Sequence, residues 1–241
     1  EYRDGDRLYL PVLRTDLISK YHGVEGKTPE LDKLGGTHWA KTKKKIKKAV
    51  EALAVELINL YAQRSVAAGF AFSPPDRLFH EFEAGFEYDE TPEQARAIEE
   101  CLNDMREERP MDRLVCGDVG YGKTEVAIRA AFKAALDNKQ TAILVPTTIL
   151  AQQHCLTFTK RLSPYPAVVD VLSRFRTKAE QKKTIERLKK GEVDIIIGTH
   201  RLLQNDVEFK DLGLIIVDEE HRFGVRQKEA LKKMKKTVDC L

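Results

Sequence analysis

Short apolar runs alternate with longer segments of mixed polarity over the second half of the chain. The apolar runs predict strands, and the spacing of apolar residues between them predicts helices that begin near residues 123, 148, 177 and 200. Alternation of this kind indicates an α/β fold with a parallel sheet that helices cover on both faces. The predicted strands are 113–116, 141–145, 167–172, 193–197 and 213–217.

The first part of the chain predicts one long helix between two linkers. Thr37 can cap a helix that runs to about Ala68, because apolar residues recur there at intervals of three and four. Residues 1–18 indicate a hairpin with its turn at residues 4–6, and residues 19–36 and 69–75 have the glycine and proline content of linkers. The apolar positions of the long helix are Ile46, Val50, Leu53, Leu57 and Leu60 or Tyr61.

These patterns divide the chain into three segments. Residues 1–22 are expected to end a small β domain, residues 23–85 to hold a linker and the long helix, and residues 86–241 to form the lobe with the parallel sheet. Within that lobe a first helix is expected after Thr91, with Pro92 in its first position. The sequence begins inside a predicted strand and stops soon after another begins, so we expect a piece of a larger protein.

Residues 117–124 read G-D-V-G-Y-G-K-T and fit the phosphate-binding pattern G-x-x-x-x-G-K-[ST]. Glycines let backbone N–H groups turn around a phosphate, Lys123 can reach the β- and γ-phosphates of ATP, and Thr124 can ligate Mg²⁺. A glycine turn without a ligand is the alternative, but it leaves the Lys-Thr pair unexplained. The candidate nucleotide-binding loop comprises Gly117, Asp118, Val119, Gly120, Tyr121, Gly122, Lys123 and Thr124.

Polar clusters follow four of the predicted strands. In an open parallel sheet these strand ends share one edge, where ligands bind. After the last strand, Asp218 can hold Mg²⁺ and Glu219 can polarise the attacking water, although an acidic pair there could instead cap a helix. The clusters are residues 146–148, 173–175, 198–200 and 218–219.

Composition narrows the function classes only slightly. With 42% hydrophobic and 33% charged residues the chain is globular, and its net charge of +3 is too small to identify a nucleic-acid partner. No apolar run has the length of a membrane span, and the four cysteines lack metal or redox spacing, so we expect a cytoplasmic protein with reduced thiols. The six lysines between residues 41 and 48 form either a solvated helix face or a patch that follows DNA phosphates.

Together with the glycine loop, the sequence D-E-E-H-R-F-G-V-R-Q at 218–227 resembles superfamily-two DNA helicases and translocases. Within these it is similar to the RecG-type fork helicases and to the bacterial transcription-repair coupling factors. The resemblance covers nearly the whole chain and implies a RecA-like lobe of a P-loop NTPase that binds ATP and Mg²⁺. The stretches that favour the coupling factors are residues 34–41, 54–64, 113–132 and 146–154.

The resemblance also implies roles for individual residues. Phe86 and Gln94 are similar to the Q motif, in which an amide can read the edge of adenine. Lys123, Asp218 and Glu219 stand at the catalytic positions of motifs I and II, with Thr124 and Asp218 as the magnesium ligands. Segments similar to motifs Ia, Ib and Ic would face the DNA backbone, and they contain Thr147, Arg174, Phe175, Thr199 and His200.

The implied partners are double-stranded DNA, RNA polymerase through its β subunit, and an excision-repair damage-recognition protein bound by regions outside this sequence. Residues 1–22 would end the polymerase-interacting domain, and residues 37–68 would connect it to the motor. Motif III and a second lobe with an arginine finger are expected beyond Leu241. No membrane partner is implied, and we expect a monomer.

The sequence therefore predicts the first motor lobe of an ATP-driven DNA translocase, poorly active alone, that acts on stalled RNA polymerase in transcription-coupled nucleotide excision repair. A RecG-type fork-remodelling helicase has the same motor and is one alternative. A polymerase-docking adaptor without activity and a P-loop ATPase without a DNA role are two others.

Overall fold

The structure is a computed structural model, and it describes residues 3–18, 31, 33, 36–118, 120–235 and 237–241. The chain forms two compact units, residues 1–59 and residues 60–241. The three-part division expected from the sequence, with boundaries after residues 22 and 85, stays a prediction. Most of the predicted linker at 19–36 lies outside the described residues.

The first unit contains two 3₁₀ helices, η1 (Arg3–Gly5) and η2 (Val12–Leu17), and most of the helix α1 (His38–Val66). The hairpin predicted for residues 1–18 is wrong, because the described residues 3–18 include no strand. An isolated two-stranded hairpin needs an apolar surface to pack against. Here Leu8 is 59% exposed and Tyr9 is 86% exposed, so these side chains gain little from burial.

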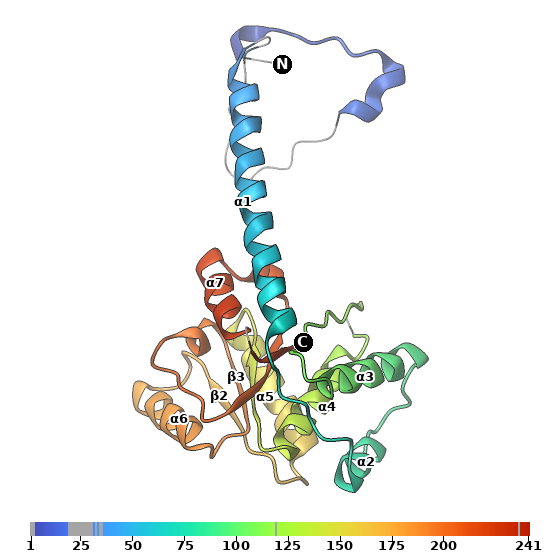
Figure 1. Cartoon of the computed structure of the whole chain (residues 1–241), viewed down its shortest axis with the longest axis vertical. Coiled ribbons are helices and arrows are strands. Elements are labelled where there is room, and N and C mark those ends of the chain that lie inside the picture. The colour runs from blue at the N-terminus through green and yellow to red at the C-terminus, as the bar shows by residue number, and fades with distance from the viewer. Residues whose placement is uncertain (1–2, 19–30, 32, 34–35, 119, 236) are drawn as a thin grey trace. The chain divides into compact units, whose positions relative to one another are not determined.

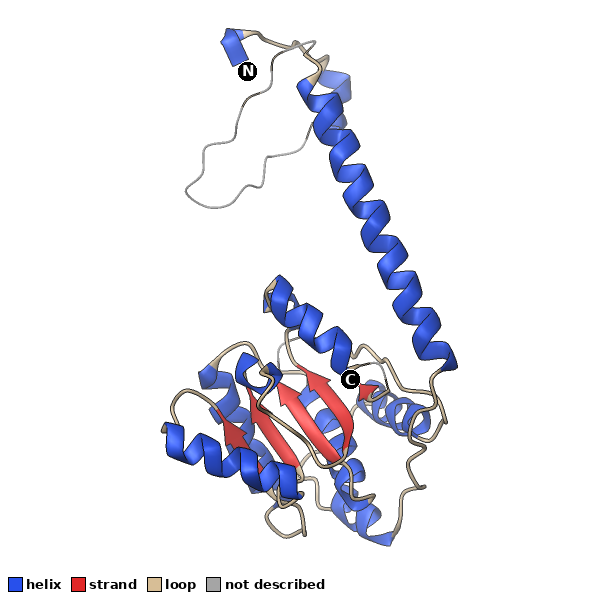
Figure 2. Ribbon diagram, turned by 60° about the vertical axis from the view of Figure 1, so that its left-hand side comes forward, coloured by secondary structure: helices blue, strands red, loops and turns tan. Residues whose placement is uncertain are grey.

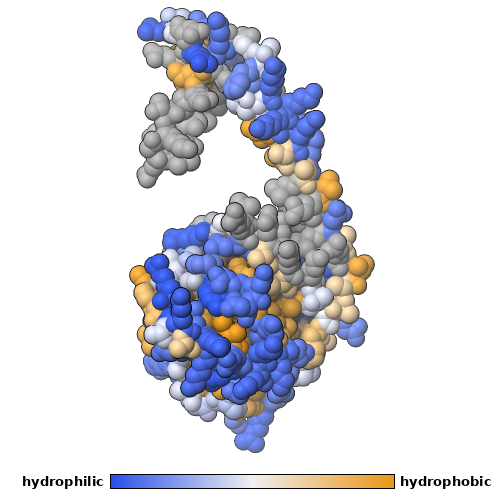
Figure 3. Space-filling view, turned by 90° about the vertical axis from the view of Figure 1, so that its left-hand side faces the viewer, coloured by the Kyte–Doolittle hydropathy of each residue, from blue (hydrophilic) through white to orange (hydrophobic). Residues whose placement is uncertain are grey.

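Helix α1 confirms the predicted long helix, and the two members of its apolar stripe whose side chains are described are exposed. Ile46 and Val50, two members of the apolar stripe, are 55% and 59% exposed, and the side chains of the other stripe positions are not described. The early turns of α1 present mostly hydrophilic side chains with single hydrophobic ones between them (Figure 3). Among the lysines, Lys47 lies 3.9 Å from Glu51 as an exposed ion pair.

The second unit is built on a five-stranded sheet in the order β2-β3-β1-β4-β5, and all its pairs are parallel. Ile143 of the central strand pairs with Ile197 on one side and Ile216 on the other. This sheet confirms the α/β fold predicted from the alternating pattern. The strands are β1 (Gln140–Leu144), β2 (Val169–Leu172), β3 (Ile195–Gly198), β4 (Leu212–Val217) and β5 (Asp239–Cys240).

Helices cover both faces of this sheet (Figure 1, Figure 2). Successive residues of β3 alternate between two hydrophobic clusters: Ile195 and Ile197 pack with α2, α3, α4 and α5, whereas Ile196 packs with α6, α7 and η3. Two buried faces explain why β3 and β4 contain no polar side chain. The helices are α2 (Arg77–Ala84), α3 (Pro92–Met105), α4 (Lys123–Leu136), α5 (Thr148–Leu162), α6 (Lys178–Lys190), η3 (His200–Leu203), η4 (Glu220–Arg222) and α7 (Val225–Met234).

Two local predictions need correction, and one helix was not predicted. Residues 113–116 are not a strand, because only Asp112 bridges to the two-residue strand β5, and Leu114 is 85% exposed. The helix expected near residue 200 is the four-residue 3₁₀ helix η3. Helix α2 was not predicted, although the Asp76 carboxylate caps it by accepting from Phe79 N at 2.8 Å.

Asp239 is a buried carboxylate where β5 meets the segment that leads to the glycine loop. Its Oδ1 atom accepts a hydrogen bond from Met111 N at 2.8 Å, and its buried Oδ2 atom has no hydrogen-bond partner among the described residues. Burial raises the pKa of Asp239 to about 7, although the Met111 N–H group and the Arg64 charge act in the opposite direction. The ionised form of Asp239 therefore destabilises the fold.

This raised pKa predicts a stability that falls as the pH rises. Between about pH 4 and pH 7 the folded chain holds a proton on Asp239 that the unfolded chain has released, so folding is favoured at the acidic end of that range. Asp239→Asn should remove this dependence and stabilise the chain at pH 8, by up to about 4 kcal/mol for a shift of about three pKa units. Urea unfolding of parent and variant at pH 5 and pH 8 measures it; parallel pH dependences would contradict it.

Candidate nucleotide-binding site

The glycine loop enters helix α4 with the backbone that its sequence predicts. Gly120 and Gly122 have φ values of +84° and +73°, a conformation that disfavours residues with a Cβ atom. Gly122 is also the N-cap of α4, and no side chain caps this helix N-terminus. The first N–H groups of α4 are thus available to an anion. Of the eight predicted loop residues, Val119 alone lies outside the described part of the chain.

Lys123 places its ammonium group within the loop that precedes it. The Lys123 Nζ atom donates to the carbonyl oxygen of Gly117 and, at 2.9 Å, to that of Asp118. A positive charge held there is suited to neutralising phosphate oxygens. The next residue, Thr124, is the second residue of α4 and is partly buried.

Asp218 stands at the end of β4, next to the central strand. Its backbone N–H donates to Leu144 O at 2.9 Å, and its Oδ2 atom lies 3.0 Å from His154 Nε2. The hydrogen bond from His154 holds the pKa of Asp218 below its usual value against the effect of burial, and the charges of His154 and Lys123 lower it further. The Asp218 carboxylate is therefore ionised and interacts electrostatically with the lysine of the glycine loop.

Glu219 has a left-handed backbone, with φ 53° and ψ 49°, which is uncommon for a residue with a side chain. Strained conformations of this kind concentrate at functional sites. Its Oε2 atom lies 2.8 Å from Arg222 Nε as an ion pair, without the angle of a hydrogen bond. Glu219 thus retains lone pairs on its carboxylate that can accept hydrogen bonds from a water molecule.

These residues fit a magnesium–nucleotide complex. A Cβ atom at Gly120 would meet no atom within 4 Å, so the loop has open space beside its backbone, and the N-terminus of α4 has no side-chain cap. A hydroxyl and a carboxylate, as in Thr124 and Asp218, are the oxygen ligands that Mg²⁺ prefers. Thr124 and Asp218 would hold the ion together with phosphate oxygens.

Gln94 joins the start of α3 to the glycine loop. Its Oε1 atom accepts from Thr91 N at 2.9 Å, which completes a capping box, and its Nε2 atom donates to Tyr121 O at 2.7 Å. Both ends of the amide therefore already have a protein partner, and each keeps one further hydrogen-bonding position. The structure places Gln94 beside the loop, whereas adenine recognition stays a prediction.

Phe86 lies beside two guanidinium groups, those of Arg129 and Arg161, whose Cζ atoms are each 5.6 Å from its ring centroid. These contacts are within the range of cation–π attraction. Its ring also makes an edge contact with Tyr88 at 5.6 Å. Phe86 is therefore held in a fixed environment on the loop before α3, and stacking on adenine stays a prediction.

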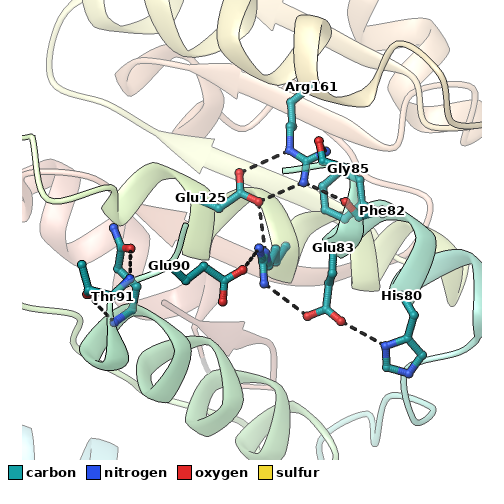
Figure 4. A network of polar contacts seen from close by, with 10 residues as sticks. His80, Phe82, Glu83, Gly85, Glu90, Thr91, Glu125 and Arg161 are labelled. Atoms are coloured by element: carbon teal, nitrogen blue, oxygen red, sulfur yellow. Dashed lines mark hydrogen bonds and ion pairs between the residues drawn. The ribbon is translucent and has the colours of Figure 1, made fainter. Parts of the chain in front are cut away.

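A network of buried charged side chains connects the loop before α3 to α2, α4 and α5 (Figure 4). The Arg129 side chain is 3% exposed and pairs with Glu83 at 3.3 Å, with Glu125 at 3.0 Å and with Glu90. Arg161 bonds to Glu125 at 3.1 Å and joins α5 to α4. Sequence reasoning missed this network, because contacts such as that of Arg129 with Glu83 join residues 46 positions apart, and no local pattern indicates them.

The predicted DNA-facing residues follow the same edge of the sheet as Asp218, but they differ in exposure. Thr147 is exposed and caps α5 by accepting from Leu150 N at 3.2 Å. Arg174 and His200 are exposed, and Phe175 is 64% exposed. Thr199 is only 4% exposed, so its side chain gives no support to a DNA contact. Nucleic-acid binding by these residues stays a prediction.

The sequence profile of the DEAD/DEAH box helicases matches residues 91–240. The chain belongs to the DEAD/DEAH box helicase family. Over its whole length it is 57% identical to the transcription-repair-coupling factor of Myxococcus xanthus and 58% identical to that of Bacillus subtilis. It spans about a fifth of the length of these curated relatives, since it covers 20% of each.

Among solved structures, the chain resembles RecG bound to a three-way DNA junction. The TM-score is 0.67 and the sequence identity 39%, over 76% of this chain and 24% of the RecG chain. Within the residues that the structure describes, no helix is both long and apolar enough to cross a membrane. The four cysteines are free thiols, and burial raises the pKa of Cys101 to about 12 and that of Cys240 to about 11.

Two substitutions should separate nucleotide binding from hydrolysis. Lys123→Ala should weaken ATP affinity about tenfold or more, because it removes charge-assisted hydrogen bonds to phosphate. Glu219→Gln should keep that affinity within about twofold and lower turnover about 10²-fold or more, because it removes the carboxylate that is predicted to polarise water. ATP affinity is measured on this chain, and ATP affinity and turnover are both measured on the complete protein. A Glu219→Gln variant with parental turnover would remove Glu219 from this role.

Proposed function

We propose that this chain is the ATP-binding first lobe of a double-stranded DNA translocase that acts on stalled RNA polymerase in transcription-coupled nucleotide excision repair. The observation that carries the ATP-binding part is the glycine loop, in which Lys123 is held by loop carbonyl groups and which leads into the N-terminus of α4 without a side-chain cap. The polymerase and repair parts rest on the chain's full-length similarity to transcription-repair-coupling factors.

In this proposal each site residue has one task in ATP hydrolysis. The N-terminus of α4 and Lys123 bind the phosphates, and Thr124 and Asp218 hold Mg²⁺, which neutralises developing charge on the phosphate oxygens. Glu219 orients the attacking water and polarises it. Loss of phosphate would change the closure of this lobe against a second one, and such closure steps the motor along DNA.

The strand-end clusters are proposed to bind the DNA backbone. Arg174 and His200 are exposed at the edge that also carries Asp218, so contacts there can respond to the nucleotide. Contacts to phosphates are independent of base sequence and weaken with salt. The proposal names duplex DNA as the ligand of this edge.

RNA polymerase, through its β subunit, and an excision-repair damage-recognition protein are proposed as partners of the complete protein. Both partners are suggested by the name of the relatives, transcription-repair-coupling factor, which refers to transcription and to repair. Residues 1–22 are proposed to end the polymerase-interacting domain. We further propose that the protein acts in the cytoplasm and that the chain is a monomer.

A RecG-type fork-remodelling activity is the second candidate, and the 39% identity to RecG favours it. The complete protein distinguishes the two when given both substrates, a polymerase stalled on duplex DNA and a model replication fork. ATP-dependent release of the polymerase supports the coupling function, and fork regression without release supports the alternative. The Glu219→Gln variant is the control for ATP dependence in either assay.

The chain by itself should bind Mg-nucleotide but hydrolyse it slowly. An arginine finger supplied by a second lobe accelerates related phosphoryl transfers by about 10³–10⁵-fold. Adding the second lobe should therefore restore DNA-stimulated turnover that the 241-residue chain lacks. Steady-state ATPase rates with and without duplex DNA measure this, and fast DNA-stimulated turnover by the chain alone would refute the half-motor assignment.

Arg174→Ala in the complete protein should flatten the salt dependence of DNA binding. Each phosphate contact contributes about 0.9 to the slope of log affinity against log salt, so one lost contact lowers the slope by about one unit without changing sequence preference. Arg77→Ala is the matched control, because Arg77 is an exposed arginine on α2, paired with Glu81 at 2.8 Å. An unchanged slope for Arg174→Ala would assign that residue a structural role.

A further inference from the structure

His154 is a histidine of α5 that meets the end of β4. Its Nε2 atom lies 3.0 Å from Asp218 Oδ2, across 64 residues of sequence, and its side chain is 15% exposed. The imidazole also makes an edge contact with the ring of Phe158, at 6.3 Å between centroids. Phe158 is fully buried in the core. The packing of α5 against the sheet therefore fixes the position of this imidazole.

The contact differs from an ordinary surface pair. His80 makes a contact of the same chemistry and length, with Nδ1 3.0 Å from Glu83 Oε2, but the two residues are neighbours on one helix and His80 is 66% exposed. Exposed pairs of that kind contribute little to structure. The His154 contact instead joins two elements and reaches the carboxylate next to the glycine loop.

His154 also restricts how the Asp218 carboxylate can turn. The Asp218 backbone is fixed by its hydrogen bond to Leu144 O, and the carboxylate is held by His154 at Oδ2 and by the backbone N–H group of Glu219. Carboxylates that bind metal ions are commonly oriented in this way by a second hydrogen bond, and loss of that bond typically weakens metal affinity by about 10–100-fold.

We propose that His154 is a positioning residue that orients the Asp218 carboxylate for the magnesium ion bound with the nucleotide. This proposal rests on the proposed ATP-binding function. It gives α5 two tasks, because the same helix is capped by Thr147 on the predicted DNA-facing edge.

The test measures how nucleotide binding by the 241-residue chain depends on Mg²⁺. A fluorescent ADP analogue is titrated in EDTA and then at increasing Mg²⁺ concentrations. His154→Leu should raise the half-saturating Mg²⁺ concentration about 10–100-fold and leave the affinity in EDTA within about twofold. His154→Gln, whose amide can donate at the position of Nε2, should restore most of the Mg²⁺ dependence. His80→Leu is the matched control and should change neither quantity.

Each other result contradicts a defined part of the proposal. A His154→Leu variant with the parental Mg²⁺ requirement, or with an equal loss of affinity in EDTA, overturns the positioning role alone. A parent chain that binds no nucleotide overturns the proposed ATP-binding function and the positioning role with it. Thermal unfolding checks that the variants fold, and where His154→Leu lacks the parental transition, His154→Asn replaces it in the same titration.

Discussion

The parallel pairing of β1 with β3 on one side and β4 on the other is the constraint on which the rest of the lobe depends. Because all three strands run in one direction and in register, their carboxyl ends meet at one edge. Hydrogen bonds extend the pairing beyond the strands, from Asp218 N to Leu144 O and from Val145 N to Gly198 O. The residues that follow β1, β3 and β4, which are far apart in the sequence, are thereby brought together at one edge of the sheet.

Polar side chains that hydrogen-bond to other segments of the chain hold the loops of this edge in place. Gln94 ties the capping box of α3 to the glycine loop, and His154 ties α5 to Asp218. Gln181 of α6 acts similarly, since it donates to Ser173 O and Arg176 O and accepts from Arg201 Nε. In each case a side chain of a helix holds a loop or a strand end in place. Because these helices pack on the buried core, the contacts restrict movement of the surface segments.

Buried charge in the lobe divides into satisfied and unsatisfied groups. Arg129 is surrounded by three carboxylates, which compensates for its removal from water. Asp239 accepts one hydrogen bond, and its other buried oxygen has no partner among the described residues. Burial therefore raises the pKa of Asp239 and favours the neutral carboxyl group. The burial of these two charged groups is therefore compensated in different ways, although both lie within the same lobe.

The sequence by itself determined what depends on near neighbours in the chain. The apolar runs identified β1 to β4, the Thr91-Pro92 start identified α3, and the glycine loop indicated a candidate phosphate site, because each of these patterns spans only a few residues. Such patterns reflect local backbone preference and burial, so the elements that they predict are also found in the folded chain.

Only the tertiary structure decided which distant residues meet. The His154–Asp218 and Arg129–Glu83 contacts join segments 64 and 46 residues apart, and no local pattern records such a distance. Tertiary context also overruled local preference. Residues 113–116 have the composition of a strand, but β5 beside them is only two residues long, and Thr199 follows a strand like its neighbours yet is buried. Pairing partners and burial are properties of the assembled fold, so sequence pattern alone could not fix them.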